Sequence, residues 1–283
     1  MQAIELAAIV IRVPDRSIRA TSEISTASTR RQFVKAMGGA ATAVGAVSVR
    51  EAGAQTPTRA GITTLGFDAY GTLFDVFSVT ALCEELFPGR GDALAQLWRA
   101  KQLQYSLLRS LMGRHRDFWR LTADGLVYAS KSLSLDLTPD TRQRLMDAYL
   151  TLTAFPDVRS GLERLKQDGV RLAILSNGEP KMLQAAAESA GIAPLLDAIL
   201  SVEDVNVFKP SPRVYNLIAE RLPGGPGTVG FVSANSWDIA GAGSAGLTTF
   251  WIQRSAAEPP EELGFPATHV VGGITDLPAI LRA

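Results

Sequence analysis

Short apolar runs and longer amphipathic stretches alternate along the chain from Gly61 onward. Between the short runs, apolar residues recur every three or four positions, for example in Leu162–Lys166 and Met182–Ser189, which is typical of helices with one buried face. Short strands that alternate with helices favour a parallel sheet covered on both faces. We therefore predict an α/β fold with a Rossmann-like, doubly wound parallel sheet. The expected strands are Ile62–Phe67, Val170–Ser176, Ala198–Ser201, Thr228–Ala234, Thr248–Ile252 and His269–Val271.

A long interval between the first two expected strands breaks this alternation. The segment 76–155 carries apolar residues at helical spacing, in numbers too great for one exposed helix. Pro139 is placed to begin one of its helices, and Pro156 marks the return to the sheet. We predict that 76–155 is an inserted helical cap domain, and that 61–75 and 156–283 together form the α/β core.

The first 54 residues differ in composition from the rest of the chain. Paired arginines, Arg30 and Arg31, precede a mildly apolar run of small residues, Ala36–Val49, and an Ala-Gly-Ala triplet that ends at Ala54. This order is typical of a twin-arginine signal peptide (1–54) and predicts export to the periplasm. The run is too short and too glycine-rich to span a bilayer, so no membrane anchoring is expected. The alternative is a disordered leader or a mis-assigned start codon, which would leave the protein in the cytoplasm.

The composition narrows the chemistry that the chain can perform. Lys plus Arg equal Asp plus Glu at 28 each, so no net charge directs it to nucleic acid or to an anionic membrane. Cys83 is the single cysteine, which excludes an internal disulfide and a multi-cysteine metal site. His115 and His269 are the only histidines and offer little for a metal centre or a Ser-His-Asp triad. Catalysis must then depend on carboxylates, Lys, Arg and hydroxyl groups.

Four polar stretches fall at or near the carboxyl ends of expected strands. Asp68 ends the first strand, Ser176-Asn177-Gly178 ends the second, Ser233–Asp238 ends a later one, and Lys209 is expected to open the helix after Ala198–Ser201. Each alone suits a turn, a surface lysine or an acid at a helix N-terminus. Open parallel sheets bind ligands at this edge, so the four together predict one site.

These stretches also carry a resemblance to a known family. "FDAYGT", "SNG", "KPSPRVY" and "SANSWD", in this order and with a helical insert after the first, resemble the haloacid dehalogenase (HAD) superfamily. More narrowly, they resemble its type II (S)-2-haloacid dehalogenases, and "LWRAKQLQYSLLRSLM" is similar to that family's cap. The resemblance extends from Gly61 to the C-terminus. It implies a HAD-like core with a cap, and hydrolysis of short-chain (S)-2-haloacids to (R)-2-hydroxyacids plus halide.

Tyr70 separates this activity from that of the superfamily's phosphatases. In those enzymes a second Asp two residues after the nucleophile protonates a departing alkoxide, and Tyr70 lacks the acidity of a carboxylic acid. A halide leaves without a proton, so a dehalogenase needs no general acid at this position and loses little activity when tyrosine stands there. Phosphatases also hold Mg²⁺ with carboxylates in the last motif, where this chain has Ser233 and Asn235. We therefore expect no metal and no cofactor.

The resemblance further implies a two-step mechanism. Asp68 attacks the carbon that bears the halogen and forms an ester, with inversion at that carbon. Water, positioned by Asp238 with Asn235 and Ser233, then attacks the ester carbonyl. Ser176 is implied to bind the carboxylate of the substrate.

The remaining site residues are assigned by the same resemblance. Thr72, Lys209 and Tyr215 are implied to orient and neutralise the nucleophile, and Arg99 with Asn177 to cradle the leaving halide. Tyr215 and the helical apolar residues also suit ordinary core packing. The implied substrate-binding wall consists of Ala69, Tyr70, Leu103, Phe118 and Trp237.

We expect a small-molecule 2-haloacid as the substrate, no nucleic-acid partner, and a homodimer. Two other functions stay open. A magnesium-dependent HAD phosphatase with a diverged motif would lose activity with a chelator, whereas a dehalogenase would not. A secreted, non-catalytic binding protein of the same fold would have no need of Asp68, Lys209, Asp238 and Arg99 together.

Overall fold

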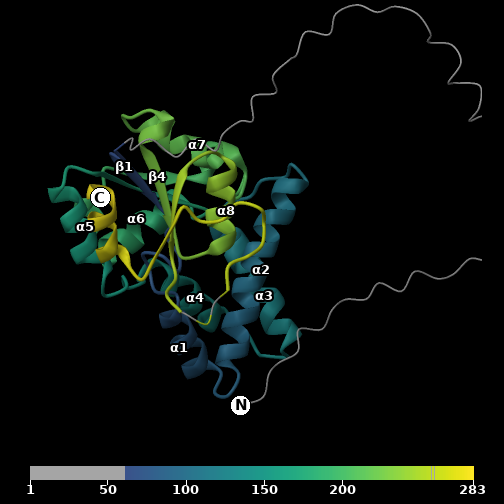
Figure 1. Cartoon of the computed structure of the whole chain (residues 1–283). Helices are drawn as coiled ribbons and strands as arrows, with labels where there is room; N and C mark the ends of the chain where they lie inside the picture. The colour runs from purple at the N-terminus through teal and green to yellow at the C-terminus, as the bar shows by residue number, and fades with distance from the viewer. Residues whose placement is uncertain (1–60, 256, 258) are drawn as a thin grey trace, which may run out of the picture. The chain divides into compact units, whose positions relative to one another are not determined.

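The computed structural model describes residues 61–255, 257 and 259–283. The expected signal peptide lies outside these residues. Six parallel strands form one sheet in the order β3-β2-β1-β4-β5-β6 (Figure 1). The prediction of a doubly wound parallel sheet is confirmed. The strands are β1 (Thr64–Phe67), β2 (Arg171–Ser176), β3 (Ala198–Ser201), β4 (Val229–Ser233), β5 (Thr248–Ile252) and β6 (His269–Val271).

The central strand β1 shows why the strands were recognisable in the sequence. It pairs with β2 and β4, and all of its residues are buried, as parallel strands covered on both faces require. The expected start at Ile62 is two residues too early. Thr63 N donates to Thr228 O at 2.9 Å, so the chain runs beside β4 before the regular ladder begins.

Helices cover both faces of this sheet. Figure 1 shows α5 and α9 on one face and α7 and α8 on the other. On the second face, Gly66 of β1 leaves room for Ile218 of α7, because a Cβ at Gly66 would meet that side chain. The helices outside the long insert are α5 (Val158–Gln167), α6 (Pro180–Ser189), α7 (Pro212–Arg221), α8 (Ser236–Ser244) and α9 (Leu277–Arg282). Short 3₁₀ turns are η2 (Ala193–Leu195), η3 (Val202–Asp204), η4 (Pro226–Thr228) and η5 (Ile274–Asp276).

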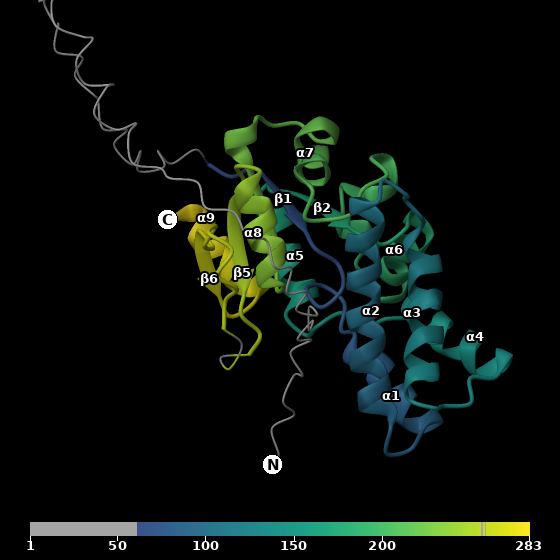
Figure 2. The ribbon, with the colours of Figure 1, turned by 90° about the vertical axis from the view of Figure 1, so that its right-hand side faces the viewer.

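The segment between β1 and α5 is helical, as predicted. Asp117 and Thr138 accept hydrogen bonds from the backbone at the starts of α3 and α4, and Pro139 is the first residue of α4. Figure 2 shows α2 and α3 side by side, with α1 and α4 near one end of the pair. These elements are α1 (Phe77–Leu86), α2 (Gly91–Leu111), α3 (Phe118–Ser132), α4 (Pro139–Asp147) and η1 (Ala148–Leu150).

The two ends of this helical segment lie together beside the loop that follows β1. Phe74 pairs with Ala154 in an antiparallel bridge, and Phe155 N donates to Leu73 O at 3.1 Å. A single apolar cluster extends from the sheet into α2 and α3. The helical segment is thereby held over the carboxyl ends of the strands. No helix in the described part of the chain is long and apolar enough to cross a membrane.

Candidate active site

The carboxyl ends of β1, β2 and β4 bring the predicted polar residues together. Ser176 and Ser233 are the last residues of β2 and β4, and Asp68 follows β1 directly. Asp68 N donates to Val232 O at 2.9 Å, which keeps Asp68 level with the end of β4. Because β1 lies between β2 and β4, Asp68 stands at the centre of this edge.

The Asp68 carboxylate accepts three hydrogen bonds. Lys209 Nζ donates to Oδ1 at 3.0 Å. Thr72 Oγ1 and Asn235 Nδ2 donate to Oδ2 at 3.0 and 2.9 Å. Only 7% of Asp68 is exposed. Donors on both carboxyl oxygens fix the orientation of this side chain. Asp68 is therefore held in one orientation at the centre of the site.

Lys209 lies between two carboxylates. Besides Asp68, its Nζ donates to Asp238 Oδ2 at 2.8 Å, and Lys209 itself is 3% exposed. Burial alone would lower the pKa of Lys209, but the charges of Asp238 and Asp68 outweigh it and the pKa is raised. Burial raises the pKa of Asp238 to about 6, against the attraction of Lys209 and with the repulsion of Asp68. The Lys209 ammonium group thus donates hydrogen bonds to both Asp68 and Asp238.

Lys209 does not open a helix, contrary to the prediction. Helix α7 begins at Pro212, with Ser211 as its N-cap residue. The residue before a proline is driven out of the helical region, and Pro210 follows Lys209 directly. Lys209 N donates instead to Asn177 Oδ1 at 3.0 Å, which ties this loop to the end of β2.

Tyr215 supports Asp238 rather than Asp68, which differs from the predicted role. Its hydroxyl donates to Asp238 Oδ1 at 2.6 Å. Burial and the neighbouring Asp238 raise the pKa of Tyr215 well above its usual value, so it stays a donor. The residue lies on α7, whose partner on this face is α8. Gly241 of α8 allows the approach, because a Cβ there would collide with the Tyr215 hydroxyl.

A tight turn after Asp68 aims the Thr72 hydroxyl. Gly71 has a φ of 88°, a backbone conformation that glycine adopts at little cost. The carbonyl of Ala69, whose side chain is fully buried, accepts from the backbone N–H groups of Leu73 and Phe74 at 2.9 Å each. Thr72 Oγ1 also accepts from Ala234 N at 2.8 Å, so its proton is free to point at Asp68. Ala69 shapes this turn by its backbone.

Asn235 bridges two oxygens that could otherwise ligate a cation. Its Nδ2 donates to Asp68 Oδ2 at 2.9 Å and lies 3.4 Å from Tyr70 O. Ser233 Oγ accepts from Asn235 N at 3.1 Å and holds the loop at the end of β4. An amide N–H₂ group thus faces both oxygens, whereas a hard cation is bound by oxygen atoms and not beside an N–H donor. The described residues contain no group of three or more His, Cys, Asp or Glu side chains placed to hold a metal ion.

The loop after β2 presents a hydroxyl beside backbone N–H groups. Ser176 Oγ accepts from Gly178 N at 3.1 Å, and Ser176 is 1% exposed. Asn177 follows it and is largely buried. Ser176 and Asn177 thus lie at the predicted strand end, although neither is within hydrogen-bond distance of Asp68 in the described contacts.

Aromatic rings form the wall opposite the strand ends. The Tyr70 ring stacks on Phe118 with centroids 5.9 Å apart and meets Tyr149 edge-on at 6.0 Å. The Tyr70 hydroxyl is buried and has no hydrogen-bond partner among the described residues. Burial raises the pKa of Tyr70, so it is a poor proton donor to a leaving group. Beside this wall, Leu103 and Trp237 line a cavity of about 380 Å³ together with Asn177, Lys209, Leu107, Ser106, Gln104 and Pro210.

Arg99 approaches from the helical segment. It lies on α2 and its guanidinium donates to Gln102 Oε1 at 3.1 Å, with no direct bond to Asp68. Gln102 was not predicted as a site residue. The signal that could have found it is its spacing, because it lies four residues after Trp98 and four before Ser106 and so falls on the buried face of α2. Arg254 was also missed. It donates to Thr72 O at 2.6 Å and to Asp157 Oδ1 at 3.0 Å, and so links the turn after Asp68 to the end of the helical segment.

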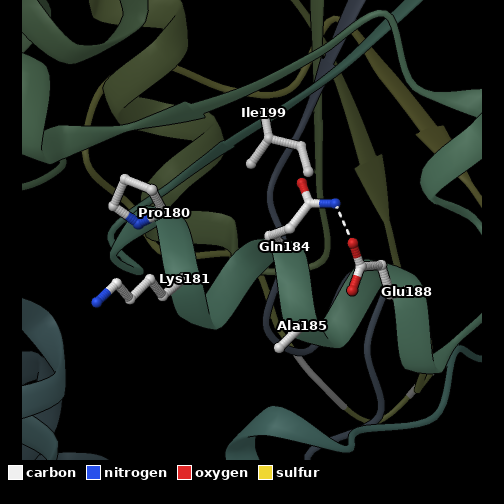
Figure 3. Close-up of a pocket in the computed structure, with 6 residues that line it drawn as sticks. All are labelled: Pro180, Lys181, Gln184, Ala185, Glu188 and Ile199. Carbon is white, nitrogen blue, oxygen red and sulfur yellow. Dashed lines mark hydrogen bonds between the residues drawn. The ribbon is translucent and has the colours of Figure 1, made fainter.

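Another hollow lies between α6 and the edge strand β3. Its volume is about 480 Å³, and Gln184 Nε2 donates to Glu188 Oε1 within it at 2.6 Å (Figure 3). None of the predicted site residues lines it. The lining residues are Pro180, Lys181, Gln184, Ala185, Glu188 and Ile199.

Known proteins share this sequence and fold. A family model described as haloacid dehalogenase-like hydrolase matches residues 62–246. An (S)-2-haloacid dehalogenase of Pseudomonas sp. (strain YL) is 47% identical over 191 residues, which cover 68% of this chain and 82% of that protein. One of Pseudomonas putida is 43% identical over 211 residues, which cover 75% and 92%.

A solved structure shows the same fold with a bound reactant. It is the L-2-haloacid dehalogenase from Xanthobacter autotrophicus with chloropropionic acid covalently bound. Its TM-score is 0.74 at 38% sequence identity, and the match covers 78% of this chain and 99% of that one. Together with the strand-end carboxylates and lysine, these matches show that the chain belongs to the haloacid dehalogenase-like hydrolases.

Proposed function

We propose that this chain is an (S)-2-haloacid dehalogenase that hydrolyses short-chain 2-haloalkanoates to (R)-2-hydroxyacids and halide. The observation that supports the proposal most strongly is the environment of Asp68. It is a buried carboxylate with three donors, and a tyrosine stands where a phosphatase needs a second acid. Such a group is oriented to attack carbon, and the site lacks the means to protonate an alkoxide.

In the first step, Asp68 displaces the halide. A carboxylate oxygen forms a bond to C2 of the substrate while the carbon–halogen bond breaks on the opposite side, which inverts C2. The halide departs with the electron pair of that bond. Ser176 and the backbone N–H groups near it bind the substrate carboxylate, and Arg99 with Asn177 receives the halide. The aromatic wall at Tyr70 excludes water from the alkyl group.

In the second step, water cleaves the ester at Asp68. Asp238 takes a proton from the water as the water oxygen bonds to the carboxyl carbon of Asp68. The bond between that carbon and the ester oxygen then breaks, and the ester oxygen leaves as the hydroxyl group of the product by taking the proton from Asp238. Both Asp238 oxygens have partners, Tyr215 and Lys209, yet a carboxylate has lone pairs for a further donor. Lys209 neutralises the charge that grows at the ester carbonyl.

The contacts of Asn235 support a reaction without a metal ion. Its amide N–H₂ group faces both Asp68 Oδ2 and the Tyr70 carbonyl oxygen. A magnesium ion beside Asp68 would need oxygen ligands in place of this donor. The three hydrogen-bond donors around Asp68 therefore suit a carboxylate nucleophile that they orient directly, without a metal ion. A magnesium-dependent phosphatase is the competing function, and its sensitivity to a chelator distinguishes it.

Two structural proposals accompany this function. The helical segment 76–155 would act as a cap domain over a core of 61–75 and 156–283, with its paired linkers as the hinge. The cap would also mediate a homodimer, because α2 with its C-cap residue and α3 expose several large apolar side chains, and exposed apolar surface is often found at interfaces. These are Leu107, Leu108, Leu111, Met112 and Tyr128. Light scattering after size-exclusion chromatography should give the mass of two chains, and Leu111→Glu should shift it toward one.

Export is a further proposal. The paired arginines and the Ala-Gly-Ala triplet support a twin-arginine signal cut after Ala54, which would place the enzyme in the periplasm. N-terminal sequencing of protein from the native host should begin at Gln55. An intact leader on cytoplasmic protein would exclude export.

Halide release tests the proposed function. The purified chain is incubated with each enantiomer of 2-chloropropionate and 2-bromopropionate in the presence of EDTA. We expect halide and (R)-lactate from the (S)-enantiomers and none from the (R)-enantiomers. No halide release, together with EDTA-sensitive hydrolysis of phosphate esters, would replace the dehalogenase with the phosphatase.

A further inference from the structure

Helix α2 buries a polar amide inside its apolar face. Leu94, Trp98, Gln102 and Ser106 follow one another at intervals of four and are all buried, and Gln102 is 0% exposed. A buried amide is costly unless both of its ends are hydrogen-bonded. Gln102 meets this condition, because its Oε1 accepts from Arg99 and its Nε2 donates to a residue of α3.

The partner on α3 determines which way this amide points. Gln102 Nε2 lies 2.7 Å from Thr122 Oγ1, and Thr122 Oγ1 lies 2.7 Å from the Phe118 carbonyl oxygen one turn earlier. The threonine hydroxyl has one proton, and the carbonyl can only accept it. Thr122 must therefore accept from Gln102, which leaves Oε1 of Gln102 to face Arg99. The amide cannot flip without the loss of both hydrogen bonds.

This chain of hydrogen bonds ends at the Arg99 guanidinium. Among the described residues, Gln102 is the only hydrogen-bond acceptor of that group, so its other N–H groups stay available to an anion. The arrangement borders the site wall. Tyr149 OH lies 3.4 Å from Gln102 Oε1, and the Tyr149 ring packs edge-on against Tyr70, two residues after the nucleophile.

We propose that Gln102 is a positioning residue of the dehalogenation, which holds the Arg99 guanidinium so that its remaining N–H groups meet the departing halide. The inference rests on the proposed function. A planar guanidinium stabilises a forming anion only in the correct orientation, and a displacement of about 1 Å costs roughly 100-fold in rate. Thr122 contributes to this positioning, because its hydroxyl determines which way the Gln102 amide points.

The test replaces Gln102 by methionine, which has a similar length but no acceptor oxygen. Gln96→Met is the matched control. Gln96 lies on the same helix and is exposed, and its one hydrogen-bond partner among the described residues is the nearby Asp92. For Gln102→Met we expect kcat on (S)-2-chloropropionate to fall by roughly 10- to 100-fold. The inhibition constant of added bromide should rise by about tenfold, which corresponds to about 1.4 kcal/mol. Inhibition by propionate, which has a carboxylate and no halogen, should stay unchanged.

Halide inhibition separates positioning from a purely structural role. Thr122→Val is the second variant, because it keeps the shape of the side chain and frees the amide to rotate. It should also raise the inhibition constant of bromide. If Gln102→Met does not fold, the bromide inhibition of Thr122→Val tests the inference instead. Bromide inhibition equal to that of the wild type in the folded variants, or an equal loss of propionate binding, would overturn the inference. A wild-type chain that releases no halide would instead remove the proposed function, and this inference with it.

Discussion

Replacement of Lys209 by methionine removes the ammonium group that two buried carboxylates share. Lys209 Nζ lies 3.0 Å from Asp68 Oδ1 and 2.8 Å from Asp238 Oδ2. At an effective dielectric constant near 20, each attraction is worth about 6 kcal/mol before the cost of burying the ammonium is subtracted. Breaking a buried ion pair on one side costs about 3–5 kcal/mol in practice. If about 4 kcal/mol of this is lost at the transition state, the rate falls by about 1,000-fold.

The change should also appear in the dependence of activity on pH. The attraction of Lys209 lowers the pKa of Asp238, so its removal should raise that pKa further. We expect kcat/KM of Lys209→Met to be at least about 1,000-fold lower at pH 7, and the acid limb of kcat to move to higher pH. Lys166→Met is the control, because Lys166 makes a surface ion pair with Asp197 at 3.5 Å. A Lys209→Met enzyme within tenfold of the wild type, with an unmoved acid limb, would refute this reasoning.

The structure supports three more predictions. Because Asp238 must be ionised to activate water in the second step and its pKa is raised to about 6, kcat should fall as the pH drops through about 6, and a flat profile of kcat down to pH 4.5 would contradict this. Because Tyr70 replaces an acid, p-nitrophenyl phosphate with Mg²⁺ should not be turned over, and hydrolysis that EDTA abolishes would contradict this prediction. Gly241→Ala should lower the free energy of unfolding in urea by about 1–3 kcal/mol, since its Cβ would collide with the Tyr215 hydroxyl, whereas Gly243→Ala has ordinary contacts and should be nearly neutral.

The strands and the strand-end residues could be predicted because they follow local rules. Strands buried on both faces are continuous apolar runs, and parallel strands bring their carboxyl ends to one edge. Asp68, Ser176 and Ser233 were placed correctly for this reason. Thr72 follows from the same logic, since it lies on the turn directly after Asp68.

Partners that depend on helix packing could not be predicted in the same way. Tyr215 meets Asp238 because α7 packs on α8, with Gly241 between them. Gln102 meets Thr122 because α2 packs on α3, and the sequence spacing of these two residues does not reveal it. Such contacts depend on the angle and the offset between two helices, which the periodicity of either helix leaves undetermined.

The covalent attack by Asp68 is the central claim, and one isotope measurement tests it. Enzyme in excess over (S)-2-chloropropionate is allowed a single turnover in ¹⁸O-water, and the peptide that contains Asp68 is then weighed by mass spectrometry. If Asp68 is the nucleophile, the hydrolytic oxygen enters its side chain, so the peptide gains ¹⁸O and the lactate stays mostly unlabelled. If Asp68 only activates water, the lactate carries ¹⁸O at once and the peptide mass does not change. An unlabelled Asp68 peptide beside labelled lactate would contradict the account.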